Sequence, residues 1–146
     1  MTRFVADACV ILSWLLDEGA STQTDNLLDS LATGGIVESP VLLRYEVANG
    51  LVMAFKPKKR ISQEACFSGL KDFDRLPIRY DTESPRLATT HIAELAVKHS
   101  LTIYDAAYLS LAIRNGLTLA TFDEKLAKSA ISEGILVVGW KGKDND

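Results

Sequence analysis

Four acidic residues interrupt apolar parts of the sequence: Asp7, Glu46, Asp105 and Asp123. Asp7 ends a short apolar run with the character of a strand, and Asp123 closely follows another. Glu46 lies on the apolar side of a helical pattern, and Asp105 stands in the first turn of a helix that is apolar nearly all round. An ionised carboxylate buried without a partner costs far more free energy than a small domain can spare. Each acid therefore needs a set of hydrogen bonds, a base or a cation.

Each acid taken alone has an ordinary structural interpretation. Asp7, Asp105 and Asp123 stand where predicted helices begin, and Asp is favoured as the residue that caps a helix N-terminus. Glu46 could form an ion pair with a distant base, since Arg44 is two residues away and points elsewhere on a helix. The residues alone leave these interpretations open.

Together, the four acids favour a metal site. Asp7 and Asp123 would lie at strand-to-helix turns on one edge of a parallel sheet, where ligands bind, and Glu46 and Asp105 would face the core from helices. Carboxylates that converge without bases repel one another unless protons or a cation neutralise them. Ligands that are all oxygen suit Mg²⁺ or Mn²⁺ better than zinc. Such a site activates water and stabilises charge on a phosphoryl oxygen, which is the chemistry of phosphodiester hydrolysis.

The elements that must position these acids follow from the hydrophobic pattern. Short apolar runs alternate with longer helix-period segments, which predicts an α/β protein with a central, mostly parallel sheet of about five strands. Strands are expected at 4–6, 36–38, 78–80, 117–120 and 135–138. Helices are expected at 8–16, 21–31, 39–55, 62–76, 84–99, 104–114 and 123–133. Two of these helices are predicted to begin at Ser-Pro pairs, Ser39-Pro40 and Ser84-Pro85.

Length and composition fit one domain with a substantial core. The chain has 146 residues, of which 47% are hydrophobic, and this excludes a disordered or low-complexity protein. Its two cysteines, Cys9 and Cys66, match neither a zinc site nor a disulfide scaffold. No stretch reaches the ~18 apolar residues that span a membrane, and Asp7 interrupts the apolar N-terminal run early, so we expect a cytoplasmic protein. The formal net charge of -3 argues mildly against a nucleic-acid partner unless that partner is held locally.

Four short motifs, in their order and spacing, resemble the PIN-domain ribonucleases, and in particular the VapC-like toxins of bacterial and archaeal toxin–antitoxin pairs. The motifs are VADACV at 5–10, EVANG at 46–50, YDAAYLSLA at 104–112 and LATFDEKL at 119–126. The resemblance runs from Phe4 to about Val138. It implies a PIN domain over 1–138, folded as an α/β/α sandwich, and a polar C-terminal tail over 139–146.

The resemblance places the family's four acids on Asp7, Glu46, Asp105 and Asp123, which would be both the catalytic residues and the ligands of Mg²⁺ or Mn²⁺. It implies that a metal-activated water attacks an RNA phosphodiester and leaves a 5′-phosphate and a 3′-hydroxyl. Family members are typically homodimers, and a cognate antitoxin wraps the toxin and often inserts a basic side chain into the acidic pocket. We therefore expect RNA, an antitoxin and a second copy of the chain as partners, and no membrane.

Three further residues are expected to support the acids. By the resemblance, Thr121 is the polar residue two positions before the fourth acid, and Asn49 follows Glu46 by one turn. Cys9 departs from the family pattern, which usually has Ser or Thr two residues after the first acid. A thiol is a weak hydrogen-bond partner, so this departure bears on a supporting contact and not on the acids.

A basic segment contains Lys56, Lys58, Lys59 and Arg60, which are four of the 16 bases of the chain. These side chains could contact RNA phosphates beside the acidic pocket, or they could form a solvated surface turn. The sequence leaves both interpretations open.

Other functions of α/β proteins fit the sequence less well. A receiver domain needs a second acid beside the first, and a nucleotide-binding domain needs a Gly-rich phosphate loop; the sequence contains neither. A non-toxin PIN nuclease of RNA processing and an inactive PIN-fold binding module remain as alternatives. The presence of all four acids disfavours the inactive module.

Overall fold

The computed structural model describes residues 2–19 and 21–141 of the chain. Five short strands form one sheet, and every neighbouring pair in it is parallel. The strands are β1 (Arg3–Ala6), β2 (Ile36–Pro40), β3 (Ile78–Asp81), β4 (Thr118–Thr121) and β5 (Val137–Gly139), in the order β3-β2-β1-β4-β5. Phe4, Val5 and Ala6 are fully buried, because a parallel sheet carries helices on both faces. The predicted parallel sheet of about five strands is confirmed.

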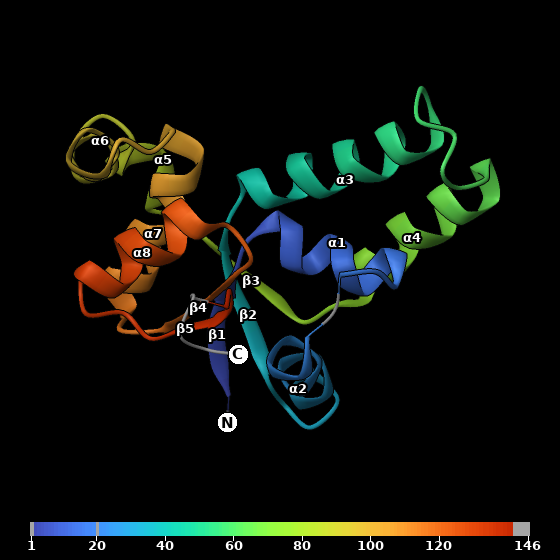
Figure 1. Ribbon diagram of the computed structural model, residues 1–146, viewed down its shortest axis with the longest axis horizontal. Helices are drawn as coiled ribbons and strands as arrows, with labels where there is room; N and C mark the ends of the chain where they lie inside the picture. Colours follow the sequence, from blue (N-terminus) through green and yellow to red (C-terminus); the bar gives the residue numbers. More distant parts are fainter. Residues whose placement is uncertain (1, 20, 142–146) are drawn as a thin grey trace.

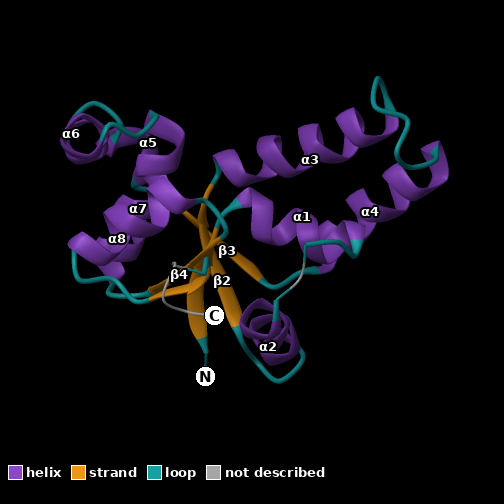
Figure 2. Cartoon of the chain, in the orientation of Figure 1, coloured by secondary structure: helices purple, strands orange, loops and turns teal. Residues whose placement is uncertain are grey.

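Helices cover both faces of the sheet (Figure 2). One layer contains α1 (Ala8–Leu16), α2 (Thr22–Leu31), α3 (Leu42–Phe55) and α4 (Gln63–Arg75), and the other contains α5 (Ser84–Leu87), α6 (His91–His99), α7 (Ile103–Asn115) and α8 (Glu124–Ser132). Helix α7 is buried along residues 106–112, as its apolar sequence predicts. Helices α3 and α4 form a helical hairpin, and the loop that joins them lies at its tip, away from the sheet (Figure 1).

The order of the strands places a topological switch at the middle of the sheet. From β1 the chain steps outward to β2 and β3, and then returns to add β4 on the other side of β1. Ligands of open α/β sheets bind at the carboxyl ends of the strands on either side of such a switch. Ala6 pairs with Ala120, so the residues that follow β1 and β4 meet at this edge.

The helix expected at 39–55 begins later than its Ser-Pro pair suggests. Its first residue is Leu42, because Ser39 and Pro40 extend β2 and Pro40 pairs with Asp81 of β3. The Ser39 hydroxyl donates to the Pro40 carbonyl oxygen and caps no helix. The prediction was wrong here because strand pairing outweighs a local helix-start signal.

The single helix expected at 84–99 is in fact two helices, α5 and α6. The break lies between Leu87 and His91, and Thr90 there has a non-helical backbone, with φ -127° and ψ -99°. Thr89 and Thr90 are β-branched, which lowers their helix propensity and favours a break at this point.

The C-terminal boundary also shifts slightly. Strand β5 takes in Gly139, which the sequence assigned to the polar tail at 139–146. Residues 142–146 of that tail lie outside the described residues. Within residues 2–19 and 21–141, no helix is long and apolar enough to cross a membrane.

Candidate active site

Asp7 lies at the carboxyl end of β1, where it also caps α1. Its backbone N–H donates to the Ala120 carbonyl oxygen at 3.1 Å and so continues the pairing of β1 with β4. Its Oδ1 accepts from the Val10 backbone N–H at 3.2 Å, and its Oδ2 accepts from the Thr121 hydroxyl. The residue is only 5% exposed. Asp7 is thus a helix cap, as its position suggested, and it also lies at the edge where ligands bind.

Thr121, the last residue of β4, connects two of the acids. Its buried hydroxyl donates to Asp7 and accepts from the Asp123 backbone N–H at 3.0 Å. Asp123 is exposed and caps α8 by accepting a 2.7 Å hydrogen bond from the Leu126 N–H. One hydroxyl therefore ties together the two turns that follow β1 and β4.

Glu46 and Asp105 come from helices of opposite layers. Glu46, on α3, accepts a 2.6 Å hydrogen bond from the Tyr108 hydroxyl. Asp105 lies in the first turn of α7, where Thr102 Oγ1 accepts from its backbone N–H at 3.1 Å. Asp105 and Tyr108 are three residues apart on α7 and so share one face of that helix. Tyr108 therefore holds Glu46 on the side of α7 that carries Asp105.

Tyr108 is the site residue that the sequence analysis missed. The signal was a hydroxyl within a helix that is otherwise apolar, since a buried Tyr usually donates its O–H to a partner. The sequence had allowed an ion pair between Glu46 and a distant base. In the described part of the chain Glu46 forms no such pair, and its partner is this neutral hydroxyl.

The electrostatics of Asp7 are dominated by its burial. Burial penalises the charged form and raises the pKa of Asp7 to about 6. The hydrogen bonds from Thr121 and Val10 oppose this rise, and the charges of Asp105 and Glu46 add to it. Ionisation of Asp7 is therefore disfavoured by two carboxylates on helices that are distant in the sequence.

The charges of neighbouring acids also raise the pKa of Glu46 and of Asp105. Burial, and then the charge of Asp105, raise the pKa of Glu46 against the Tyr108 hydrogen bond. Burial, and then the charge of Asp123, raise the pKa of Asp105. Desolvation of the Cys9 thiol, followed by the charges of all four acids, raises its pKa to about 11. The four carboxylates thus share one electrostatic environment, with Cys9 in their common field.

The acids lack basic partners. In the described residues none of the four takes part in an ion pair. A donor set of carboxylate oxygens fits a hard divalent cation such as Mg²⁺ or Mn²⁺. The side chains do not form a closed ligand set, since across residues 2–19 and 21–141 no group of three or more His, Cys, Asp or Glu is arranged to hold an ion. Binding of a cation would require these side chains to close around it.

The three predicted supporting residues differ in their surroundings. Thr121 makes the contacts described above. Cys9, on α1, and Asn49, on α3, are both exposed, and neither has a side-chain hydrogen bond to another described residue. Only Thr121 is therefore tied to an acid by a hydrogen bond.

The basic segment lies away from the acids. Residues 56–60 occupy the exposed loop between α3 and α4, and Arg60 forms an ion pair with Glu18. The rise of a helix places Lys56 ~15 Å along α3 from Glu46. The structure therefore does not bring the four bases into the acidic site.

A groove lies between α1, α3 and the basic loop. It is lined along α1 by Cys9 and Leu12, on α3 by Gly50, and in the basic loop by Lys58 and Arg60. Gly50 leaves room for the α1 side chain, because a Cβ there would come within 2.5 Å of Leu12 Cδ1. The groove leads from Cys9, two residues after Asp7, to the basic loop, and none of the four acids is among its lining residues.

A parallel sheet in this order, with acids gathered where β1 and β4 end, defines a PIN-like α/β domain. The family model described as PIN domain matches residues 4–131. The chain belongs to the PIN domain family.

Comparison with individual proteins agrees with this assignment. The chain is 32% identical over 127 residues to Ribonuclease VapC1 of Mycobacterium tuberculosis, which covers 87% of this chain and 90% of that protein. The structure of PAE2754 from Pyrobaculum aerophilum aligns with a TM-score of 0.67 at 22% identity, covering 94% of this chain and 91% of the other. VapBC2 from Rickettsia felis, bound to a DNA fragment from their promoter, aligns with a TM-score of 0.65 at 20% identity, covering 96% and 100%. The two structures confirm the α/β/α fold.

Proposed function

We propose that this chain is a metal-dependent endoribonuclease and the toxin of a toxin–antitoxin pair. The observation that carries the proposal is that the charges of Asp7, Glu46, Asp105 and Asp123 all act on Cys9, while none of the four is paired with a base in the described residues. Similarity to a protein named Ribonuclease VapC1 supports RNA as the substrate, and the fold shared with VapBC2 supports an antitoxin as a partner.

Asp7, Glu46, Asp105 and Asp123 would hold Mg²⁺ or Mn²⁺. Bound there, the ion supplies an activated water and stabilises the charge that builds on a phosphoryl oxygen. Hydrolysis of the RNA phosphodiester leaves a 5′-phosphate and a 3′-hydroxyl.

Thr121 and Tyr108 act as positioning residues in this site. The Thr121 hydroxyl orients one oxygen of Asp7, and the Tyr108 hydroxyl orients one oxygen of Glu46. A carboxylate oxygen that accepts one hydrogen bond keeps a lone pair for a cation. Both contacts therefore orient the carboxylates without consuming their capacity as ligands.

The partners follow from the distribution of charge. Lys58 and Arg60 line the groove along α1. Together with Lys56 and Lys59 of the same loop, they would contact phosphates of an RNA strand that lies in it. In the inhibited state a basic side chain of the antitoxin occupies the acidic edge.

We also propose a homodimer in the cytoplasm, on the basis of the family resemblance. A small neighbouring gene for a protein with a DNA-binding N-terminus would distinguish a toxin from a PIN nuclease of RNA processing.

The test compares RNA cleavage by the wild-type chain and by Asp7→Asn and Asp105→Asn with Mg²⁺ or Mn²⁺ present. Each substitution removes one charged ligand, so we expect the cleavage rate to fall by at least about a hundredfold. The matched control is Glu124→Gln, an exposed acid next to Asp123 that pairs with Lys128. Circular dichroism checks that each variant is folded. Full activity in both Asp variants would refute the assignment of the site, and would leave an inactive binding module as the better interpretation.

A further inference from the structure

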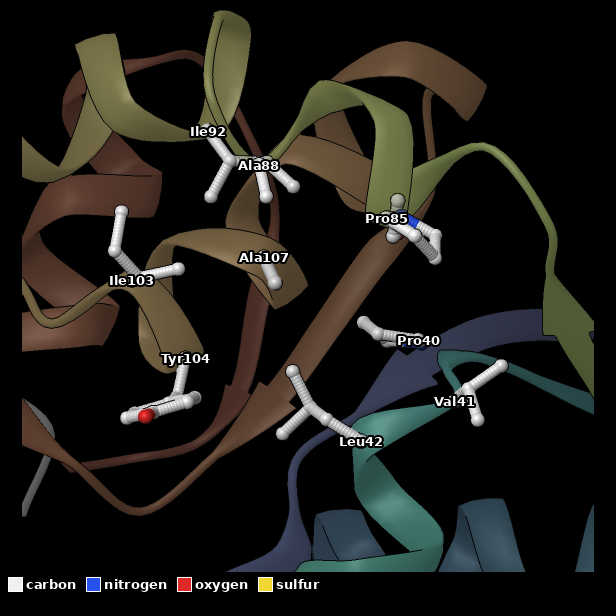
Figure 3. Close-up of a pocket in the computed structure, with 10 residues that line it drawn as sticks. Pro40, Val41, Leu42, Pro85, Ala88, Ile92, Ile103, Tyr104 and Ala107 are labelled. Atoms are coloured by element: carbon white, nitrogen blue, oxygen red, sulfur yellow. The ribbon is translucent and has the colours of Figure 1, made fainter.

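An apolar pocket opens beside Tyr104, between the first turns of α3 and α7 and the helices α5 and α6 (Figure 3). Its floor is buried and includes Pro40, Ile92 and Ala107, and its rim includes the exposed side chains Val41 and Tyr104. The pocket has a volume of about 190 Å³. A partly exposed pocket of this kind gains free energy when an apolar group fills it.

Two walls of the pocket belong to the helical turns that carry the acids. Leu42 lies one turn before Glu46 on α3, and Tyr104 directly precedes Asp105 on α7. In Figure 3 Leu42 and Tyr104 lie on the same side of the pocket, with Ile92 opposite. A strand whose scissile phosphate is held at Glu46 and Asp105 would lie near this pocket, because Leu42 and Tyr104 belong to the same helical turns as those acids.

We propose that this pocket binds the base of a nucleotide next to the scissile phosphate, with the ring of Tyr104 as its stacking surface. The inference rests on the proposed function, and it specifies the substrate as single-stranded RNA with an unstacked base. Proteins that bind single-stranded RNA stack its bases on aromatic side chains. The lining is almost wholly apolar, so the pocket recognises the face and size of a base more than its hydrogen-bonding edge.

Tyr104 is exposed and lines the pocket, whereas Tyr45 is exposed and does not. Tyr104 is 63% exposed, although its ring borders an apolar hollow. Tyr45 precedes Glu46 as Tyr104 precedes Asp105, and it is 77% exposed, but it does not line the pocket. The chain therefore contains its own matched control for an exposed tyrosine next to a site acid.

The test uses the full chain with Mg²⁺ or Mn²⁺ and a single-stranded oligoribonucleotide that carries a cleavage site mapped with the wild-type protein. We expect Tyr104→Ala to raise KM about tenfold, in the range that base–aromatic stacking supplies, with a smaller change in kcat. Tyr104→Phe should keep the wild-type KM because it keeps the ring, and Tyr45→Ala should leave both constants unchanged. An abasic nucleotide beside the scissile phosphate should raise KM for the wild type and have no further effect in Tyr104→Ala.

Three outcomes would overturn the inference. If the wild type cleaves RNA while Tyr104→Ala and the abasic substrate keep the normal KM, the pocket binds no base and the proposed function stands. If Tyr104→Ala converts a dimer into a monomer in light scattering, a second copy of the chain covers the pocket. If the wild type cleaves no RNA with either metal, the proposed function fails and the base pocket fails with it.

Discussion

Asp7 and Asp81 occupy similar places at the carboxyl ends of parallel strands, and the protein compensates their charges in opposite ways. Asp81, the last residue of β3, accepts a 2.8 Å hydrogen bond from the Arg114 guanidinium and another from the Ser84 hydroxyl. Burial acts to raise its pKa, but these bonds outweigh burial and hold the pKa below its usual range. Asp7 forms no ion pair with any of the residues that the structure describes, and burial raises its pKa to about 6.

The charge of Asp81 is therefore compensated within the fold, whereas the charge of Asp7 has no counter-charge among the described residues. Other acids away from the site follow the pattern of Asp81, since Glu38 pairs with Arg3 and Glu133 pairs with Lys98. Burial raises the pKa of Asp7, Glu46 and Asp105, so their ionised forms cost folding free energy while they have no counter-charge. A cation that binds only the folded state would return that free energy.

The largest effect on stability is expected when Arg114, the partner of Asp81, is replaced. Arg114→Met removes the partner of Asp81 and leaves a largely buried carboxylate uncompensated, so we expect a loss of about 3 kcal/mol in the free energy of unfolding. Asp7→Asn removes a charge that is already uncompensated, so it should cost nothing or add stability in metal-free protein. Urea unfolding at pH 7 measures both variants. Equal losses in the two would contradict the distinction between paired and unpaired acids.

Thr121→Val tests whether the hydroxyl between Asp7 and Asp123 positions the site. Loss of this contact frees the Asp7 carboxylate, and we expect Mn²⁺ affinity and RNA cleavage to fall 10–100-fold, as when a residue that orients a metal ligand is removed. The same substitution at Thr118, also on β4, is the control and should leave both unchanged. A wild-type affinity in Thr121→Val would show that Asp7 needs no such support.

The pH dependence of stability should also differ between the two kinds of acid. The folded-state pKa of Asp7, about 6, lies above the ordinary value of 3.8 for an Asp side chain, so as the pH falls the folded chain takes up a proton before the unfolded chain does. Stability of metal-free protein should therefore rise by about 1 kcal/mol as the pH falls from 7 to 5. Asp81 has a lowered pKa, so its contribution is lost only at more acidic pH. Urea unfolding in EDTA at pH 7 and pH 5 gives the answer, and the gain should shrink in Asp7→Asn. A loss of stability over this interval would contradict the account.

The smallest effect is expected at the basic loop. The double variant Lys58→Ala, Lys59→Ala should weaken RNA binding by only a few fold and reduce the slope of log affinity against log salt by about one for each lost phosphate contact. Lys128→Ala on α8 is the control, since that lysine is equally a surface base and pairs with Glu124. Fluorescence anisotropy at several salt concentrations measures the slope. An unchanged slope would show that the loop does not contact RNA phosphates and is a solvated surface turn.

The sequence predicted the sheet and the place of its acids because both depend on local pattern. Apolar runs marked all five strands, and the parallel order then brought the residues after β1 and β4 together. Helix α1 was predicted with its observed bounds, Ala8–Leu16. The start of α3 was not, because β2 pairs as far as Pro40, and that pairing depends on a strand more than 35 residues away in the chain.

The contacts that orient the acids could be predicted only in part. Thr121 was expected from the resemblance, and the structure adds its bridge from Asp7 to the backbone of Asp123. The Tyr108–Glu46 hydrogen bond joins residues 62 positions apart on helices of opposite layers, which no local pattern reveals. The basic loop follows the C-terminal end of α3, so its distance from the acids likewise depends on the direction of that helix.

The central claim is that the four carboxylates act as one metal site, and calorimetric titration of Mn²⁺ tests it most directly. We predict binding to the wild-type chain, affinity reduced at least about tenfold in Glu46→Gln and in Asp105→Asn, and no change in the control Glu124→Gln. Wild-type affinity in both site variants would show that Glu46 and Asp105 are independent structural acids, and it would contradict the account.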